Sequence, residues 1–293
     1  MKIGENWIQK IGKVNSVILG LLIVLWGCVF LVHGQVGVVA FVLLKLYLPF
    51  IGIALMGITF IWTIWRVVKK RKIAQPLVGF LMSSIMGATM LTNLGIIDLA
   101  YPAQTENLTS VIVEWPFQET TVVGWGGNTV AENYHAAYPN IRYAYDLVMQ
   151  PYDINSESNA DYGIWNKAIY SPVKGTVIGT CNEEKDIIPN LEEFSSQLGN
   201  YVFIEIEDTG TYLVLAHMKE GSVQVKVGQE VEVGTLLGNV GNSGTSSEPH
   251  LHIHHQRQNP VEILTFAEGL PLYFKGIDAG ALPVKGTVVT PNH

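Results

Sequence analysis

The sequence predicts a membrane anchor of three transmembrane helices (residues 1–100), followed by an all-β extracytoplasmic domain (residues 101–293). One observation is composition: charged residues make up 15% of the chain and hydrophobic residues 48%, which is too apolar for an average soluble protein. A second is charge. Residues 1–100 contain nine basic and two acidic residues, a net charge of +7, whereas residues 101–293 contain nine basic and 23 acidic residues, a net charge of −14. Two parts suited to different surroundings therefore meet near residue 100.

Three apolar stretches are long enough to cross a bilayer, which needs about 20 helical residues. They are expected at about 15–34, 46–67 and 77–98. The first follows basic residues, but no small-residue cleavage site follows it, so it is interpreted as a retained anchor rather than a signal peptide. Residues 36–45 either extend the second helix, tilt it, or lie at the membrane interface.

The loops between these stretches predict the orientation. Residues 66–72 carry five positive charges, which marks this loop as cytoplasmic by the positive-inside rule. The amino terminus, with Lys2, Lys10 and Lys13, is then also cytoplasmic. Three crossings place the second domain outside, so the expected location is a multi-pass position in the cell membrane, in contact with the lipid bilayer.

The second domain has the pattern of a β protein. Apolar residues alternate in 109–114, 143–149, 201–207 and 212–217, as in half-buried strands separated by glycine-rich turns. A short helical turn is expected only around 191–198. Cys28 and Cys181 lie in different parts of the chain, so no disulfide between them is expected. The acidic balance excludes nucleic acid as a partner, and the oligomeric state is left undetermined.

The candidate chemistry lies in histidines and one aspartate. His250, His252 and His254 are two residues apart and would share one face of a strand; they fit either metal ligands or a solvated polar strand. His217 ends an apolar strand, where a hydrogen-bonded core histidine is the alternative. Asp146 lies among apolar neighbours, where an unpaired carboxylate is costly to bury. A bound metal ion or an ion pair with Arg142 would explain a carboxylate at this position.

In combination these residues resemble the lysostaphin-type, or LytM-like, zinc endopeptidases, over about residues 120–265. The similar segments are Leu215-Ala216-His217, the turns 227–231 and 234–238, Gly241-Asn242-Ser243-Gly244, Pro249-His250-Leu251-His252, and the earlier stretch 171–177. The resemblance implies a LytM-like antiparallel β-sheet of the hybrid-barrel type. It also implies that Asp146 and His252 ligate Zn²⁺, with His217 and His250 as the catalytic pair.

The sequence departs from the family at one position. The family's first zinc histidine stands four residues before the aspartate, where this chain has Arg142, and an arginine cannot act as a metal ligand. His135, in Asn133-Tyr134-His135, is the expected replacement, with a solvated loop residue as its alternative. His254 is the second candidate for the third ligand.

Two ligand histidines and one aspartate leave a zinc position for water, as in catalytic sites. The resemblance therefore implies a membrane-anchored zinc metalloendopeptidase that hydrolyses peptide bonds in cell-wall peptidoglycan. A catalytically silent LytM-like domain that binds or regulates wall hydrolases is the alternative. A carrier domain of the biotinyl or lipoyl type is a third class. Such a domain carries a lysine at a hairpin tip, and this sequence has none between Val231 and Gly234.

Overall fold

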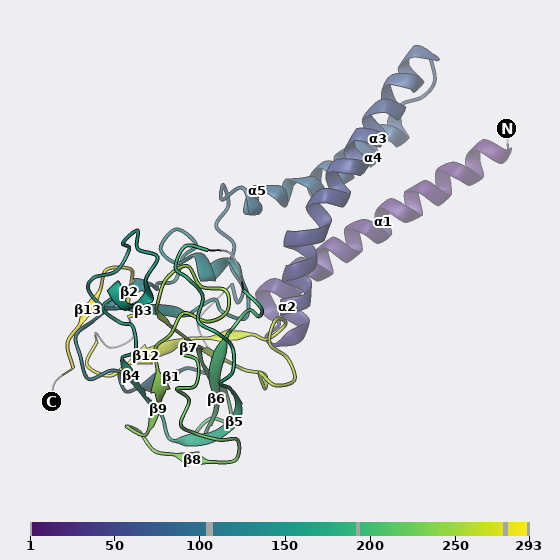
Figure 1. Cartoon of the computed structure of the whole chain (residues 1–293). Coiled ribbons are helices and arrows are strands. Elements are labelled where there is room, and N and C mark those ends of the chain that lie inside the picture. Colours follow the sequence, from purple (N-terminus) through teal and green to yellow (C-terminus); the bar gives the residue numbers. More distant parts are fainter. Residues whose placement is uncertain (1, 104–107, 192–193, 278–280, 292–293) are drawn as a thin grey trace. The chain divides into compact units, whose positions relative to one another are not determined.

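The structure is a computed structural model that describes residues 2–103, 108–191, 194–277 and 281–291, with the side chains of 2–13 and 15 left out. The chain divides into two compact units, Met1–Gln104 and Thr105–His293. The first is helical and the second is built from strands (Figure 1). Both cysteines are free, as expected.

The helical unit contains six segments: α1 (Lys2–Leu31), α2 (Gln35–Val42), the π-helix η1 (Leu43–Tyr47), α3 (Leu48–Val68), α4 (Ala74–Ala88) and α5 (Met90–Asn93). Segments α2, η1 and α3 form one continuous apolar helix, Gln35–Val68. Residues 36–45 therefore extend the second predicted helix. The third predicted span is shorter than expected, because the helix ends at Asn93 and Gly95 follows with a φ of +67°.

The prediction of three spans is only partly supported by these helices. Within the described residues, Gln35–Val68 and Ala74–Asn93 are long and apolar enough to cross a membrane. The first predicted span corresponds to Ser16–Leu31, which is apolar but shorter. By length and composition alone, the part of the chain that the structure describes therefore has two candidate spans rather than three.

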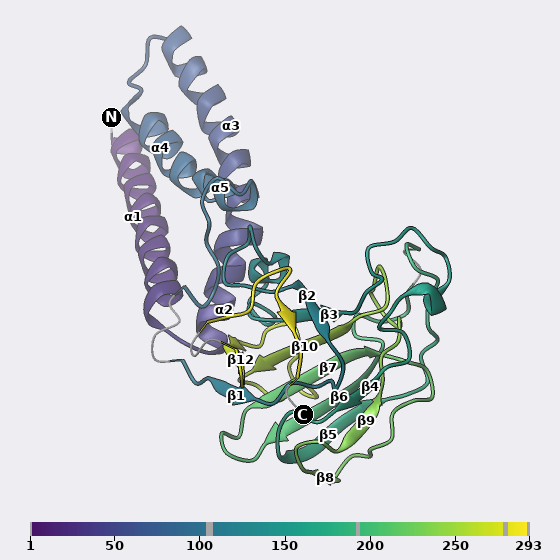
Figure 2. The same cartoon turned by 90° about the vertical axis from the view of Figure 1, so that its left-hand side faces the viewer.

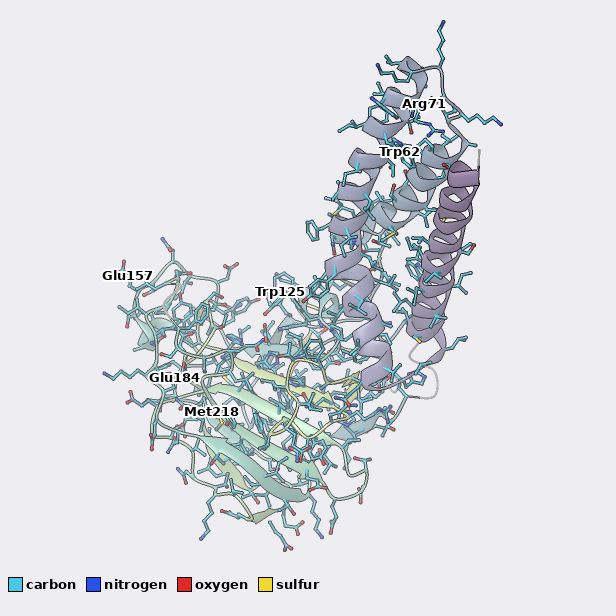
Figure 3. The ribbon with its side chains drawn as sticks, turned by 90° about the vertical axis from the view of Figure 1, so that its right-hand side faces the viewer. Trp62, Arg71, Trp125, Glu157, Glu184 and Met218 are labelled. Carbon is cyan, nitrogen blue, oxygen red and sulfur yellow. The ribbon has the colours of Figure 1, made fainter. Side chains whose placement is uncertain are left out.

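Pro49 explains the π-helix in the long helix. A proline has no N–H for the carbonyl four residues earlier, here Lys45, and its ring crowds that turn. The Lys45 carbonyl instead accepts a hydrogen bond from Asn93 Nδ2, at 2.7 Å. The end of α5 thus supplies a donor to the carbonyl that Pro49, without an N–H, cannot bond. At the other end of α3, Arg66 donates to the Lys72 carbonyl. Arg71, labelled in Figure 3, stacks on Trp65 at 5.0 Å.

The second unit contains thirteen strands and, in its described part, two short 3-10 helices. The strands are β1 (Val111–Val113), β2 (Thr121–Trp125), β3 (Tyr145–Val148), β4 (Ala168–Tyr170), β5 (Gly175–Cys181), β6 (Asn200–Ile206), β7 (Tyr212–Met218), β8 (Glu230–Val231), β9 (Leu236–Asn239), β10 (Leu251–Gln256), β11 (Gly269–Leu270), β12 (Leu272–Phe274) and β13 (Val288–Val289). The 3-10 helices are η2 (Tyr134–Ala137) and η3 (Asn159–Asp161). The expected helical turn at 191–198 is not present in its described residues.

One large sheet organises this unit (Figure 2). Its strand order is β13-β2-β3-β10-β7-β6-β5-β8, all antiparallel, with β11 also paired to β10. Two small sheets, β4–β9 and the parallel pair β1–β12, lie apart from it. The mostly antiparallel β architecture agrees with the predicted fold class.

The central strands are more buried than their alternating pattern predicts. All residues of β3 and β10 are buried, and so are those of β7 from Leu213 onward. On one face, Leu147, Leu215 and Ile253 join a core that also includes Ile169 and Leu237 from the small sheets. The opposite face carries Asp146 and His252, which the η2 segment covers through His135. Side chains that alternate along these strands therefore point either into the apolar core or into the candidate site, rather than into the core or into solvent.

His255 is the buried histidine of β10 that belongs to the scaffold. Its Nδ1–H donates to the Pro271 carbonyl at 3.1 Å, so Nε2 accepts from the Thr211 hydroxyl at 2.6 Å. Burial lowers the pKa of His255 from 6.5 to about 4. As the pH falls, His255 is therefore protonated near pH 6.5 in the unfolded chain but only near pH 4 in the folded domain.

We expect His255 to remain neutral at pH 5.5 and to destabilise the domain under acid. The stability that its neutral form contributes is complete above pH 6.5 and falls by about 3 kcal/mol as the pH drops toward 4. A titration of ¹⁵N-histidine-labelled protein by NMR checks this, with the His255 signal assigned by its loss in His255→Gln. A midpoint near 6.5 would contradict the buried, neutral state.

Candidate metal centre and active site

Strand pairing brings the predicted aspartate and histidine together. His252 on β10 stands directly opposite Asp146 on β3 and opposite Ala216 on β7. Asp146 Oδ1 is 2.9 Å from His252 Nδ1 and 3.6 Å from His250 Nε2. The three residues are 5–8% exposed, so the contacts form in a site largely closed to water.

His135 completes the group from a different part of the chain. The 3-10 helix η2 places its Nε2 at 3.4 Å from Asp146 Oδ2. One ligand atom each from His135, Asp146 and His252 lies within 4.8 Å of the others, so the three could hold a metal ion. The solvated-loop alternative for His135 is wrong, because its side chain is buried.

His254 is buried on the far side of His252. Its Nδ1 is 3.0 Å from His252 Nε2, whereas the other nitrogen of His252, Nδ1, faces Asp146. His254 is therefore next to the cluster but is not one of its three members. Arg142 does not contact Asp146; its Nη2 donates to Asn128 Oδ1 at 3.0 Å, and its guanidinium stacks on Tyr143 at 4.9 Å.

His217 and His250 lie side by side, with ring centroids 4.7 Å apart. Each donates its Nδ1–H to a backbone carbonyl: His217 to Ser243 at 2.8 Å and His250 to Glu248 at 2.7 Å. A carbonyl can only accept, so Nε2 of each neutral ring carries the free lone pair. Burial, followed by the nearby His250 and His252, lowers the pKa of His217 well below 6.5. His217 is thus neutral at neutral pH, with its lone pair on Nε2.

The backbone at His217 is left-handed, with a φ of +62°, a conformation that is uncommon for a residue other than glycine. It occurs where the β6–β7 register shifts between Asn200 and Val202. Such irregularities redirect side chains near active sites. The conformation is held on both sides, because His217 N donates to Leu198 O and His217 O accepts from Gly241 N.

The protonation states in the cluster suit a cation. Burial lowers the pKa of His135 to about 3, despite the opposing charge of Asp146. Burial would raise the pKa of Asp146, but His135, His250 and His252 outweigh it and bring it well below the usual value. A neutral imidazole and an ionised carboxylate are the forms that bind metals.

Hydrogen bonds behind the histidines leave lone pairs directed at Asp146. Asn133 Nδ2 donates to two carbonyls, so its Oδ1 accepts from His135 Nδ1 at 2.8 Å and His135 Nε2 has no proton. His250 Nε2 likewise carries a lone pair and no proton. These acceptors surround a carboxylate, which is itself only an acceptor. The donor chemistry of the described site therefore fits a divalent cation at its centre.

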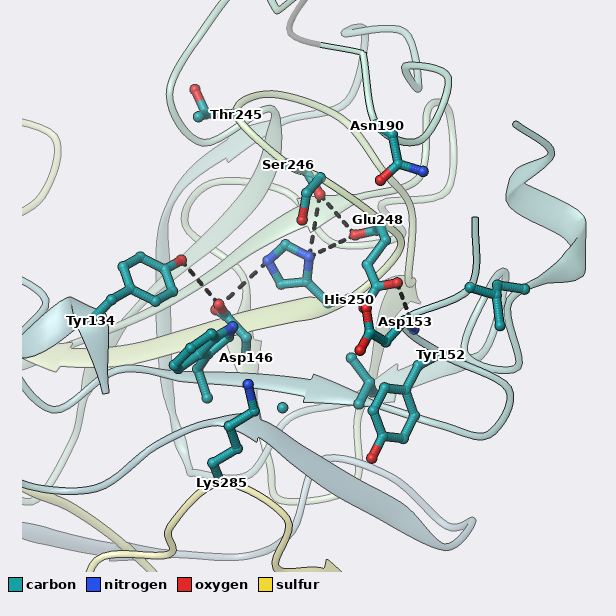
Figure 4. A pocket seen from close by; sticks show the side chains of 15 residues that line it. Tyr134, Asp146, Tyr152, Asp153, Asn190, Thr245, Ser246, Glu248, His250 and Lys285 are labelled. Atoms are coloured by element: carbon teal, nitrogen blue, oxygen red, sulfur yellow. Dashed lines mark hydrogen bonds and ion pairs between the residues drawn. The ribbon is translucent and has the colours of Figure 1, made fainter. Parts of the chain in front are cut away.

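Tyr134 is a member of the site that the sequence did not identify. Its hydroxyl donates to Asp146 Oδ2 at 3.1 Å (Figure 4). The ring packs edge-on against Trp125 and tilted against His135. Burial, followed by the charge of Asp146, raises the pKa of Tyr134, so it remains a donor at neutral pH. Adjacency to His135 was the available signal, but only the fold shows where the hydroxyl points.

A groove of about 330 Å³ opens onto the site. Asp146 and His250 lie in its wall, together with Tyr134, Tyr152, Asp153, Glu248 and Lys285 (Figure 4). Lys285 Nζ lies 3.6 Å from the Trp125 ring centroid. Asp153 N donates to the Glu248 carboxylate at 2.8 Å. The groove thus has charged groups of both signs beside the histidines.

We expect Tyr134→Phe to weaken metal binding about tenfold, the lower end of what loss of a group supporting a ligand costs. The substitution removes the hydrogen bond to Asp146 and keeps the ring that packs on Trp125 and His135. Zinc affinity measured by competition with a chromophoric chelator checks this. Unchanged affinity would show that the hydroxyl does not hold the carboxylate.

The comparison with protein families finds one match. Residues 159–263 match the model of Peptidase family M23, which is the family that the sequence resembles. The matched segment contains His217, His250 and His252 and begins after Asp146. No curated protein matches the chain.

Several solved structures are similar over part of the chain. One is the lysostaphin catalytic domain from Staphylococcus simulans, with 19% identity, 49% of this chain and 90% of that chain covered, and a TM-score of 0.29. Another is a zinc containing peptidase from Vibrio cholerae, with 22% identity, 38% and 26% covered, and a TM-score of 0.26. A third is the SpoIIQ–SpoIIIAH pore forming complex, with 20% identity, 53% and 92% covered, and a TM-score of 0.33.

Three of the matched chains are covered over only 35%, 26% and 39% of their own length. All three TM-scores given above are below 0.5, so the overall likeness says nothing about activity. The likeness to Peptidase family M23 lies in residues 159–263.

Proposed function

We propose that the β unit is a zinc metalloendopeptidase acting on peptides of cell-wall peptidoglycan, a proposal supported by the match of residues 159–263 to the model of Peptidase family M23. The observation that supports this most directly is the convergence of His135, Asp146 and His252 within 4.8 Å, with lone pairs facing a buried carboxylate. Histidine nitrogens with one carboxylate are a typical ligand set of catalytic zinc.

In this proposal three residues hold zinc: His135 through Nε2, Asp146 through its carboxylate, and His252 through Nδ1. Three protein ligands leave a further position open, as in catalytic rather than structural sites. Zinc bound there supplies a Lewis acid that lowers the pKa of water and polarises a carbonyl group. Tyr134 holds the Asp146 carboxylate in place through its hydroxyl.

His217 and His250 carry protons in this proposal. Both present Nε2 lone pairs, and the ring of His250 points at Asp146. One of the two imidazoles takes the proton of the attacking water on Nε2, and the imidazolium so formed can donate a hydrogen bond to the developing oxyanion and then pass its proton to the leaving amine. The carbonyls of Ser243 and Glu248 hold the rings in the required tautomer. The groove beside His250 then binds the substrate peptide.

The catalytically silent alternative requires a lost donor, and the described site has none missing. Arg142 occupies the position of the family's first histidine, but His135 supplies an imidazole at the same carboxylate. The carrier alternative requires a modifiable lysine at a hairpin tip, which the 231–234 turn lacks. Hydrolysis is therefore the function that the geometry supports best.

We also propose that the helical unit anchors the enzyme in the cell membrane with three spans. Its helices expose large apolar side chains, such as Leu31 (81%), Ile61 (67%) and Val68 (71%), which is unfavourable in water. The cluster of basic residues in 66–72 supports a cytoplasmic loop. The amino terminus is then cytoplasmic and the β unit is outside, where peptidoglycan lies.

We expect ligand and helper substitutions to differ in zinc content. Asp146→Ala and His252→Ala should lose zinc together with activity, because each removes a bond to the metal. His217→Ala and His250→Ala should keep zinc and lose activity by about 10²-fold or more. Metal analysis of the purified full chain and a peptidoglycan digestion assay check both. Full zinc and activity in all four would place the site elsewhere.

The same measurements identify the third ligand. His135→Ala should lose zinc as severely as His252→Ala, whereas His254→Ala should still fill with zinc at saturating metal. The opposite ranking would assign the ligand to His254. His255→Gln is the matched control, because this buried histidine lies on the same strand and the hydrogen bonds of its ring in the described structure go to Thr211 and Pro271.

We expect the topology to be measurable with single cysteines. In a chain with Cys28→Ser and Cys181→Ser, Lys69→Cys should be protected from a membrane-impermeant thiol reagent in intact cells. Glu157→Cys, on the exposed surface of the β unit (Figure 3), should be labelled. The reverse pattern would overturn both the orientation and the cell-wall substrate.

A further inference from the structure

Three side chains on one face of β10 form a continuous hydrogen-bonded row that ends at the metal site. His252, His254 and Gln256 are two residues apart, so their side chains lie on the same face. They are 5%, 1% and 0% exposed. His252 Nε2 is 3.0 Å from His254 Nδ1, and His254 Nε2 is 3.0 Å from Gln256 Oε1.

Gln256, at the end of the row away from the metal site, has its side-chain amide held in one orientation. Gln256 Nε2 donates to the carbonyl of Gln258 at 2.7 Å and to that of Ile263 at 3.2 Å. Carbonyl oxygens only accept, so the amide nitrogen must face them and Oε1 must face His254. Gln256 therefore presents an acceptor to His254 and cannot present a donor without losing both backbone contacts.

The orientation of the Gln256 amide determines which nitrogen is protonated in two rings, first in His254 and then in His252. Facing an acceptor, His254 Nε2 must carry the proton. In a neutral ring with its proton on Nε2, Nδ1 has a lone pair. That lone pair accepts from His252 Nε2–H. His252 Nδ1, 2.9 Å from Asp146 Oδ1, is then the nitrogen that offers a lone pair.

The other ligand histidine has an equivalent support. Asn133 Nδ2 donates to the carbonyls of Gly127 at 3.3 Å and Ala144 at 3.0 Å, and its Oδ1 faces His135 Nδ1 at 2.8 Å. Asn133 is fully buried. Each ligand histidine thus ends on an amide that two backbone carbonyls orient. An amide does this without a second negative charge in the buried site.

We propose that Asn133 and Gln256 are positioning residues that set the tautomers of the two histidine ligands, Asn133 directly and Gln256 through His254. The proposal depends on the proposed zinc site for its purpose, but the tautomers can be measured without zinc. In this proposal His254 is not a zinc ligand. It connects the ligand His252 to Gln256, which the backbone holds in place.

The test uses the full chain in detergent, labelled with ¹⁵N-histidine and freed of metal at pH 8. Two-bond ¹H–¹⁵N NMR correlations show which ring nitrogen is protonated, and single histidine variants assign the signals. We expect Nδ1–H for His135 and Nε2–H for both His252 and His254. Nδ1–H on neutral His254, or Nε2–H on neutral His135, would overturn the proposal.

Two variants then test the amides. Gln256→Met should give mixed tautomers at His254, and Asn133→Leu should do so at His135. Each should weaken zinc binding by about tenfold or more, measured by competition with a chelator. Asn200→Leu is the matched control. Asn200 is a buried amide that donates to Glu184 O and Met218 O but bonds to no histidine in the described structure.

The control should keep both the tautomers and the zinc affinity of the wild type. Unchanged tautomers in Gln256→Met and Asn133→Leu would refute the proposal, as would an equal loss of affinity in Asn200→Leu. If either variant fails to fold, the wild-type tautomers still decide. Correct tautomers in a protein that binds no zinc would leave the positioning network standing and remove the proposed function.

Discussion

The register between β3 and β10 is the constraint on which the site depends. It places His252 directly opposite Asp146 and, on the other side of β10, opposite Ala216, next to His217. A slip of one residue would turn every side chain of the strand to the other face. Leu251, Ile253 and His255 would then lie on the face of the carboxylate, and two histidines and a glutamine would enter the apolar core. The core therefore defines the site, because burying Leu251 and Ile253 leaves His252 only one direction in which to point.

Residues whose chemistry is local could be predicted from the sequence, and residues whose role depends on the fold could not. Asp146 stood out as a carboxylate among apolar neighbours, and the His-x-His spacing placed His250 and His252 on one face. His135 was predicted because an arginine cannot hold a metal. The sequence showed Tyr134, Asn133 and Gln256 as well, yet their roles depend on carbonyls and side chains that the fold brings near. The burial of both faces of β3 and β7 could not be predicted from alternation, because it results from the small sheets and the η2 segment.

The helical unit shows the same division between local and distant effects. Apolar length predicted the position of each helix, and the effect of Pro49 is also local. The carbonyl of Lys45, to which Pro49 cannot donate, accepts a hydrogen bond from Asn93, 48 residues away, and no periodicity indicates that contact. The ends of the third stretch were misplaced for a similar reason. Apolar residues continue past Asn93 as far as Ile97, so hydropathy alone extends the helix, whereas the backbone turns at Gly95.

The left-handed backbone at His217 has a consequence for how this domain can change. Such a conformation costs a non-glycine residue about 1–3 kcal/mol and persists only where neighbours enforce it. Here Leu198 and Gly241 hold it through backbone hydrogen bonds. Glycine would relieve the strain and leave the hairpin intact, but it would remove the imidazole. Selection for stability alone would therefore favour loss of the histidine. The proton-carrying role proposed for His217 would account for a histidine at a position where folding alone favours glycine.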